Sequence, residues 1–168
     1  QAHCPHVQRI SYSQIQQTGI SYQGKICSNN PFLTFQWRHI SGGETSPNSN
    51  QWYEVHTHLV GAYNLDNLLA AISIGHYLGV QPHEINHALT HYTPSNNRSQ
   101  LEVTKHNNLI VDAYNANPTS MEAALVNFAQ MQVAPKMAIL GDMRELGEVS
   151  VAEHQKIINL LNTLPIQQ

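Results

Sequence analysis

The segment Leu-Ile-Val-Asp-Ala-Tyr-Asn-Ala-Asn-Pro, residues 109–118, decides how the second half of this 168-residue chain is interpreted. Three consecutive apolar residues, Leu109–Val111, are typical of a short strand buried in a parallel sheet. A carboxylate, a phenol and two amides follow within residues 112–117, and all of them form hydrogen bonds with polar ligands. Ligands of doubly wound sheets bind at the carboxyl ends of strands, so this loop predicts a binding site.

A second loop has the same relation to a predicted strand. Residues 137–140 form another short apolar run, and residues 141–148 follow it with two glycines and charges of both signs. Each loop also has a purely structural interpretation, in which Asn117 or Thr119 caps a helix and Asp142 completes a turn. The coincidence of two such loops favours the binding site.

Helical patterns connect and follow these two strands. Apolar residues recur at helical spacing over residues 121–128, and residues 119–122 match a capping box. A second capping box at residues 150–153 opens a helix whose inner face is predicted over residues 157–161. Strand, helix and strand predict a right-handed βαβ unit. Two parallel strands make a poor sheet, so we expect this unit to continue beyond Gln168.

The first half of the chain has a different pattern of apolar and polar residues. Residues 20–26, 32–40 and 52–58 are β-type runs, and the alternation within the last two predicts half-buried antiparallel strands. Residues 41–50 have the composition of a loop.

Two helices are predicted next. The first ends at Gly79 and the second begins at Pro82, residue types suited to those positions. Their expected buried stripes are Leu65, Leu68, Leu69 and Ile72 in the first and Ile85, Ala88, Leu89 and Tyr92 in the second. Residues 92–98 contain Pro94 and several asparagines, which predicts a linker between two domains.

Composition excludes several classes of protein. The chain is 41% hydrophobic and 11% charged, which is typical of a globular protein, and its formal charge of −3 argues against nucleic-acid binding. No apolar run is long enough for a membrane span. Cys4 and Cys27 do not form a metal or redox motif, so we expect two free thiols in a reducing cytoplasm.

Four motifs together resemble the Mur ligase family of peptidoglycan synthesis. They are residues 61–67 (GAYNLDN), 97–100 (NRSQ), 112–118 (DAYNANP) and 140–148 (LGDMRELGE). The combination of the last two is similar to the members that join D-alanyl-D-alanine to UDP-N-acetylmuramoyl-tripeptide through an acyl phosphate made with ATP. A folylpolyglutamate synthetase-like ligase, which the YNANP loop disfavours, and a non-catalytic nucleotide- or partner-binding module are the alternatives.

The resemblance implies an α/β fold. Residues 1–95 would be the tail of a central ATPase α/β domain with antiparallel strands, and residues 96–168 the first half of an incomplete Rossmann-like C-terminal domain. The sequence contains no GxxxxGK[ST] phosphate loop, and the family's Mg²⁺ ligands have no match in it. We therefore expect this chain to be an inactive piece of a monomeric, cytoplasmic enzyme.

The resemblance also implies roles for single residues. Asn67 would hold the adenine of ATP, with Tyr63 and Asn64 beside it. Arg98 would reach the terminal phosphate, and Asp112 would contact the ribose or phosphate region; these two are the candidate catalytic residues.

Tyr114, Asn115 and Asn117 would line the same cleft. Among the histidines, the stripe of His83, His87 and His91 is expected to face water rather than to bind a metal, and His154 recurs after the last motif without an assigned role.

Overall fold

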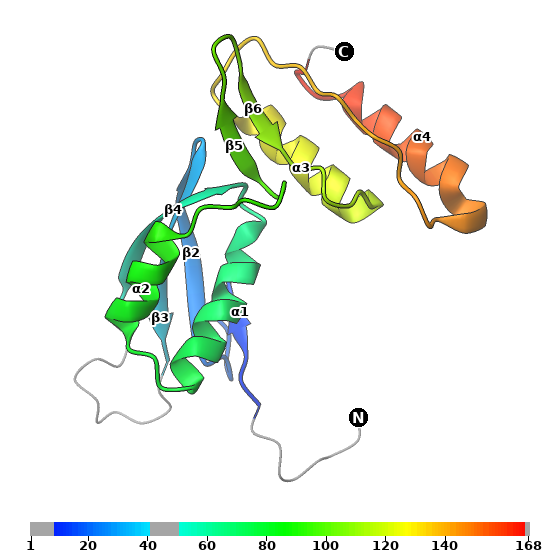
Figure 1. The fold of residues 1–168 in the computed structure, drawn as a ribbon. Coiled ribbons are helices and arrows are strands. Elements are labelled where there is room, and N and C mark those ends of the chain that lie inside the picture. The colour runs from blue at the N-terminus through cyan, green and yellow to red at the C-terminus, as the bar shows by residue number, and fades with distance from the viewer. Residues whose placement is uncertain (1–8, 41–50, 167–168) are drawn as a thin grey trace.

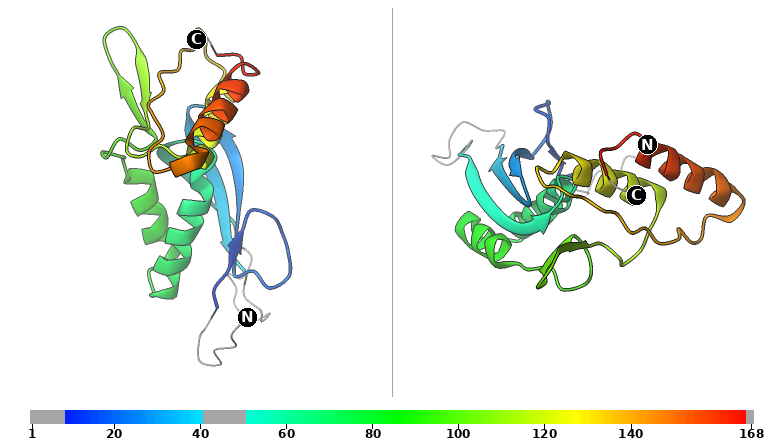
Figure 2. Two further views of the ribbon diagram at one scale, coloured as in Figure 1. Left: turned by 90° about the vertical axis from the view of Figure 1, so that its right-hand side faces the viewer. Right: turned by 90° about the horizontal axis from the view of Figure 1, so that it is seen from above.

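The computed structural model describes residues 9–40 and 51–166. A four-stranded sheet with two helices forms one part, and a β-hairpin with two further helices lies beyond one end of that sheet (Figures 1 and 2). Two separate hydrophobic clusters occupy the two parts.

The sheet has the strand order β1-β2-β3-β4. The strands are β1 (Tyr12–Ser13), β2 (Tyr22–Asn29), β3 (Phe32–His39) and β4 (Tyr53–Val60). β1 is parallel to β2, whereas β2, β3 and β4 pair antiparallel. The two antiparallel strands predicted from the alternation are therefore confirmed as β3 and β4, and the β-type run 20–26 overlaps β2. The predicted loop 41–50 lies outside the described residues.

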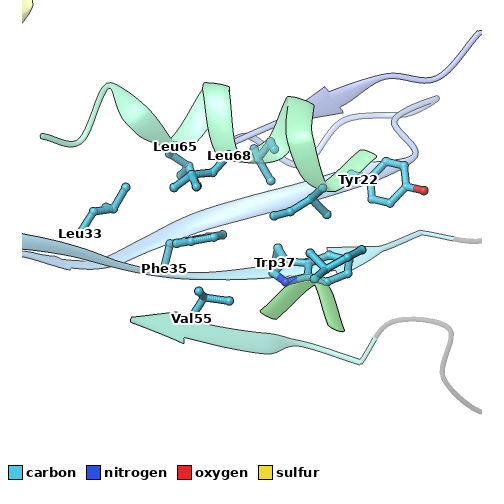
Figure 3. Packing of buried hydrophobic residues seen from close by; sticks show 10 residues of the cluster. Tyr22, Leu33, Phe35, Trp37, Val55, Leu65 and Leu68 are labelled. Atoms are coloured by element: carbon cyan, nitrogen blue, oxygen red, sulfur yellow. The ribbon is translucent and has the colours of Figure 1, made fainter. Parts of the chain in front are cut away.

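The core of this part lies between one face of the sheet and helix α1 (Asn64–Tyr77). Leu33, Phe35 and Trp37 alternate along β3 and are fully buried, and they pack against the predicted leucine stripe of α1 (Figure 3). Side chains of this size each contribute about 1.5–3 kcal/mol when they are fully buried. The helix ends as predicted, with Gly79 at a positive φ of 93° donating its N–H to the carbonyl of His76.

Helix α2 (Pro82–His91) covers the same face beside α1 (Figure 1). Its predicted buried stripe is only partly right, because Ile85 is buried but Ala88 and Tyr92 are exposed. The helix is rotated so that Asn86 faces the core, where its Oδ1 accepts a 2.8 Å hydrogen bond from Nε1 of Trp37. A buried indole N–H needs a hydrogen-bond acceptor. This requirement, rather than the spacing of the apolar residues, decides which face of α2 is buried.

The predicted βαβ unit is wrong. β5 (Gln100–Val103) and β6 (Asn108–Val111) form an antiparallel hairpin, and residues 137–140 form no strand, although Met137 makes a single β-bridge. The hairpin closes locally, since Thr104 and Asn107 hydrogen-bond across its turn. Leu109–Val111 therefore pairs with its neighbour in sequence, and Ile139 is left 87% exposed.

Two helices complete the second part. They are α3 (Pro118–Gln130) and α4 (Ser150–Leu161), which follows the 3₁₀ turn η1 (Gly147–Val149). Both helices were predicted, but neither predicted capping box forms: Asn117 caps α3 in a box with Ser120, and α4 has no side-chain cap. The two helices enclose a small core of Leu125, Met143, Ile157 and Ile166.

The stability of the first part should decrease in acid. Burial lowers the pKa of His39 and of His76 from 6.5, and the charge of His76 lowers that of His39 further. Below about pH 6.5 these two histidines are protonated in the unfolded chain but still neutral in the folded chain. The free energy of unfolding therefore falls as the pH decreases toward the folded-state pKa values of the two histidines. Urea denaturation at about pH 7.5 and about pH 5.5 should show a smaller difference for His76→Gln than for the unmodified chain. His87→Gln, on an exposed helix face, is the control; an equal effect of both substitutions would contradict the prediction.

Candidate functional site

The linker meets the sheet part at a cluster centred on Ser99. This serine is 4% exposed, and its Oγ lies 2.8 Å from the hydroxyl of Tyr63 and 3.2 Å from Nδ2 of Asn64. Its backbone N–H donates to Oδ1 of Asp112 at 3.3 Å, and the Tyr63 hydroxyl donates to Oδ2 at 3.1 Å. Both oxygens of one carboxylate thus join the start of α1 to the linker.

The backbone around Ser99 takes an unusual course. Asn97 and Ser99 both have positive φ, 57° and 48°, a region that non-glycine residues rarely occupy. The carbonyl of Asn97 accepts a 2.8 Å hydrogen bond from the N–H of Ala113. The carbonyl of Ser99 accepts a 3.4 Å hydrogen bond from the N–H of Val60. These contacts on both sides hold the two left-handed residues and direct the intervening Arg98 outward.

Arg98 lies over the ring of Tyr114, with 3.8 Å between its Cζ and the ring centroid. Both side chains are exposed, as is the neighbouring Asn115. A guanidinium stacked on an aromatic ring keeps its N–H groups in the plane available for an anion. The arrangement is therefore suited to a phosphate or a carboxylate.

The two asparagines of the first motif have different environments. Asn64 is buried, and its Nδ2 also donates to the carbonyl of Val60 at 2.9 Å, so its amide serves the local structure. Asn67 is exposed and donates to Oδ1 of Asn64 at 3.4 Å, which leaves its oxygen facing solvent. Asn117, assigned to the same cleft, uses its Oδ1 to cap α3. The contacts of these residues with ATP stay predictions.

Burial raises the pKa of Tyr63 to about 12, with a smaller opposing effect of its hydrogen bond to Ser99 and a further rise from the Asp112 carboxylate. The phenol is therefore neutral at physiological pH. Its proton is therefore available to donate to Oδ2 of Asp112 at physiological pH.

A second contact joins the two parts through Asn127 of α3. This residue is 7% exposed, and its Oδ1 accepts from Nδ2 of Asn29 in β2 and from the N–H of Ala62 at 3.2 Å. A groove of about 470 Å³ lies beside it, between α3 and the turn that contains Ala62 and Tyr63. α3 is thus fixed against the end of the sheet next to the Ser99 cluster.

The second predicted loop does not join this cluster. Residues 141–148 contact α4, where Asp142 pairs with His154 at 2.7 Å. Within residues 9–40 and 51–166, no group of three or more His, Cys, Asp or Glu side chains is arranged to hold a metal ion. His87 and His91 instead stack on one another, with 4.1 Å between their ring centroids.

Sequence reasoning missed Ser99 and Asn127 as site residues. Ser99 lies inside a motif that was singled out, but its burial depends on contacts with residues 35 to 39 positions earlier in the chain. Asn127 interrupts the apolar pattern of α3, and a polar residue at a buried helix position was the available signal.

Removing the hydroxyl of Tyr63 should loosen the junction. Tyr63→Phe deletes the hydrogen bonds to Ser99 and Asp112. Because one of these bonds is to a charged carboxylate, we expect the free energy of unfolding to fall by about 1–2 kcal/mol. Tyr114→Phe is the matched control, since Tyr114 contacts Arg98 through its ring face. Urea denaturation followed by circular dichroism measures both, and equal losses would contradict the assignment.

Asn127→Ala should destabilise the chain by about 2 kcal/mol, because it leaves the N–H of Ala62 and the amide of Asn29 without their acceptor in a buried place. Gln130→Ala, on the exposed end of the same helix, should change stability by less than about 0.5 kcal/mol. Hydrogen exchange should also quicken at Ala62 in the first variant. Unchanged exchange there would show that α3 is held by other contacts.

Comparison with known proteins agrees with this geometry. Residues 97–165 match the family model of the Mur ligase glutamate ligase domain. The chain is 36% identical over 100 residues to UDP-N-acetylmuramoyl-tripeptide–D-alanyl-D-alanine ligase of Bacillus subtilis, a match that covers 58% of this chain and 22% of that protein.

Solved structures give the same result. MurF from Acinetobacter baumannii superimposes with a TM-score of 0.75 at 28% identity, covering 94% of this chain and 32% of that one. MurF ligase from Thermotoga maritima, solved in complex with ADP, superimposes with a TM-score of 0.72 at 19% identity, which shows a shared fold, and covers 91% of this chain and 33% of that one. The chain spans about a fifth to a third of the length of these relatives. On the matched domain, residues 97–165 belong to the Mur ligase glutamate ligase domain family, and the chain as a whole is similar in sequence and fold to Mur ligases.

Proposed function

We propose that this chain supplies part of an ATP-dependent ligase that joins D-alanyl-D-alanine to UDP-N-acetylmuramoyl-tripeptide in peptidoglycan synthesis. The supporting observation is the exposed Arg98, stacked on Tyr114 beside the Asp112 junction. The similarity to UDP-N-acetylmuramoyl-tripeptide–D-alanyl-D-alanine ligases supports the same assignment.

In this proposal the residues at the junction bind and orient the nucleotide. The exposed amide of Asn67 pairs with adenine, which offers a donor next to an acceptor. The guanidinium of Arg98 meets the terminal phosphate, and its planar fork matches phosphoryl oxygens. Asp112 acts mainly through the linker, because both of its oxygens accept hydrogen bonds from the protein.

When bound, ATP supplies the phosphoryl group that activates the tripeptide carboxylate, and the amine of D-alanyl-D-alanine displaces that phosphate. The chain contributes to this reaction by position and charge. The described residues do not fit a Mg²⁺ site, so we assign the metal ligands to parts of the enzyme other than residues 9–40 and 51–166.

We further propose a boundary between residues 95 and 96, with the tail of the central domain before it and the start of the Rossmann-like domain after it. The separate cores on the two sides of the linker support this division. No helix among the described residues has the length and apolar character to cross a bilayer. Two of the proposed substrates, ATP and UDP-N-acetylmuramoyl-tripeptide, are nucleotide derivatives, and we infer a monomeric enzyme in the cytoplasm.

Phosphate release tests the proposal. The protein encoded by the whole reading frame that contains this chain is supplied with ATP, UDP-N-acetylmuramoyl-tripeptide and D-alanyl-D-alanine, and the 168-residue chain is assayed beside it. We expect release only in the longer protein and only with all three substrates. Arg98→Ala should reduce the rate at least about tenfold, because it removes charge-assisted hydrogen bonds to phosphate.

Arg144→Ala is the matched control, since Arg144 is another exposed arginine that lies in the loop contacting α4. Phosphate release that depends on a different acceptor amino acid would identify the protein as a related ligase with another substrate. Release by the 168-residue chain alone would overturn the expectation that it is inactive without a phosphate loop.

A further inference from the structure

His154, on the first turns of α4, has both ring nitrogens engaged by the protein. Its Nδ1 lies 2.8 Å from the carbonyl oxygen of Ser150, one turn earlier in the helix. Its Nε2 lies 3.1 Å from the backbone nitrogen of Met143 and 2.7 Å from Oδ1 of Asp142. The imidazole therefore connects α4 to two consecutive residues of the loop 141–148.

The two partners of Nε2 require opposite protonation states. The Ser150 carbonyl only accepts, so Nδ1 carries a hydrogen in the neutral and in the charged ring alike. In the neutral ring Nε2 has a lone pair and accepts from the N–H of Met143. In the charged ring Nε2 carries a hydrogen and donates to the Asp142 carboxylate, so the N–H of Met143 loses its acceptor.

We propose that His154 is a positioning residue that sets the conformation of the loop at Asp142 and Met143 by exchanging its hydrogen-bond partner when it gains or loses a proton. This role is independent of the ligase activity proposed above. It is not general-base catalysis, because neither ring nitrogen is left for a substrate.

The loop is built so that only one of the two partners is anchored. The side chain of Met143 is 2% exposed and packs with Leu125 and Ile157 in the core between α3 and α4. The side chain of Asp142 is 73% exposed and belongs to no core. The exchange therefore acts on Asp142 and on the Met143 peptide group while the Met143 side chain stays in place.

The groups around the ring together raise the pKa of His154 above its ordinary value. The Ser150 carbonyl raises the pKa of His154, burial opposes it, and the Asp142 carboxylate raises it further. On α4 itself, Glu153 pairs with Lys156 at 2.6 Å.

The remaining charged groups of the loop are Arg144, Glu145 and Glu148, and all three are exposed. Asp142 is thus the acidic side chain of the described loop that is paired with the imidazole.

Nuclear magnetic resonance of the uniformly ¹⁵N-labelled 168-residue chain tests the proposal. Long-range imidazole spectra at high pH should show His154 with its hydrogen on Nδ1, the tautomer that is less common in free histidine. On acidification, the Met143 amide should shift with the same midpoint as the ring, and its protection against solvent exchange, relative to the intrinsic rate at each pH, should decrease. Asp142→Asn, at an exposed side chain, should move both midpoints together to lower pH.

Glu145→Gln is the matched control, because it removes the same charge from the same loop at a side chain with no contact to the ring. It should leave both midpoints nearly unchanged. Three results would each overturn the proposal. They are a neutral ring with its hydrogen on Nε2, a Met143 amide whose resonance does not change as His154 titrates, and equal shifts of the midpoints in the two variants.

Discussion

The relation between the two parts of the molecule depends on the hydrogen bonds that the Asp112 carboxylate accepts. One oxygen takes the phenol hydrogen of Tyr63 and the other takes the backbone N–H of Ser99. Tyr63 precedes α1, and Ser99 ends the linker, so a single side chain after β6 ties together three segments that are distant in sequence. Ser99 is buried whereas Asp112 is exposed, so the junction has one side sheltered from water and one side open to it.

This junction explains the geometry of the neighbouring arginine. Asn97 and Ser99 both have positive φ and are both held by backbone hydrogen bonds, so the backbone directs Arg98 outward. Tyr114 then provides a flat surface on which the guanidinium stacks. Asn127 adds a second connection at the same end of the sheet, so the two parts are joined at two points.

Where periodicity decided the structure, the sequence was sufficient to predict it. The alternation in β3 and the leucine spacing in α1 are consequences of burying one face, and both were confirmed. The parallel βαβ unit was wrong because an apolar run such as Leu109–Val111 is equally compatible with a local hairpin. α2 was rotated from its expected face by the hydrogen-bonding need of one indole, which no periodicity reports.

The candidate site was predicted to a similar extent. Arg98, Tyr114 and Asp112 do lie together, whereas Asn117 caps a helix and the amide of Asn64 is turned inward. The roles of Ser99 and Asn127 arise only from tertiary contacts, so no local pattern could define them.

A double-mutant cycle between Tyr63 and Asp112 tests the central claim most directly. The unfolding free energies of Tyr63→Phe, Asp112→Ala and the double variant are compared with that of the unmodified chain. Because the two side chains share one hydrogen bond and the same partner, the losses should be non-additive by about 0.5–1 kcal/mol or more. Losses that add within about 0.3 kcal/mol would show that the two residues act separately, and the junction would not be the element that joins the two parts.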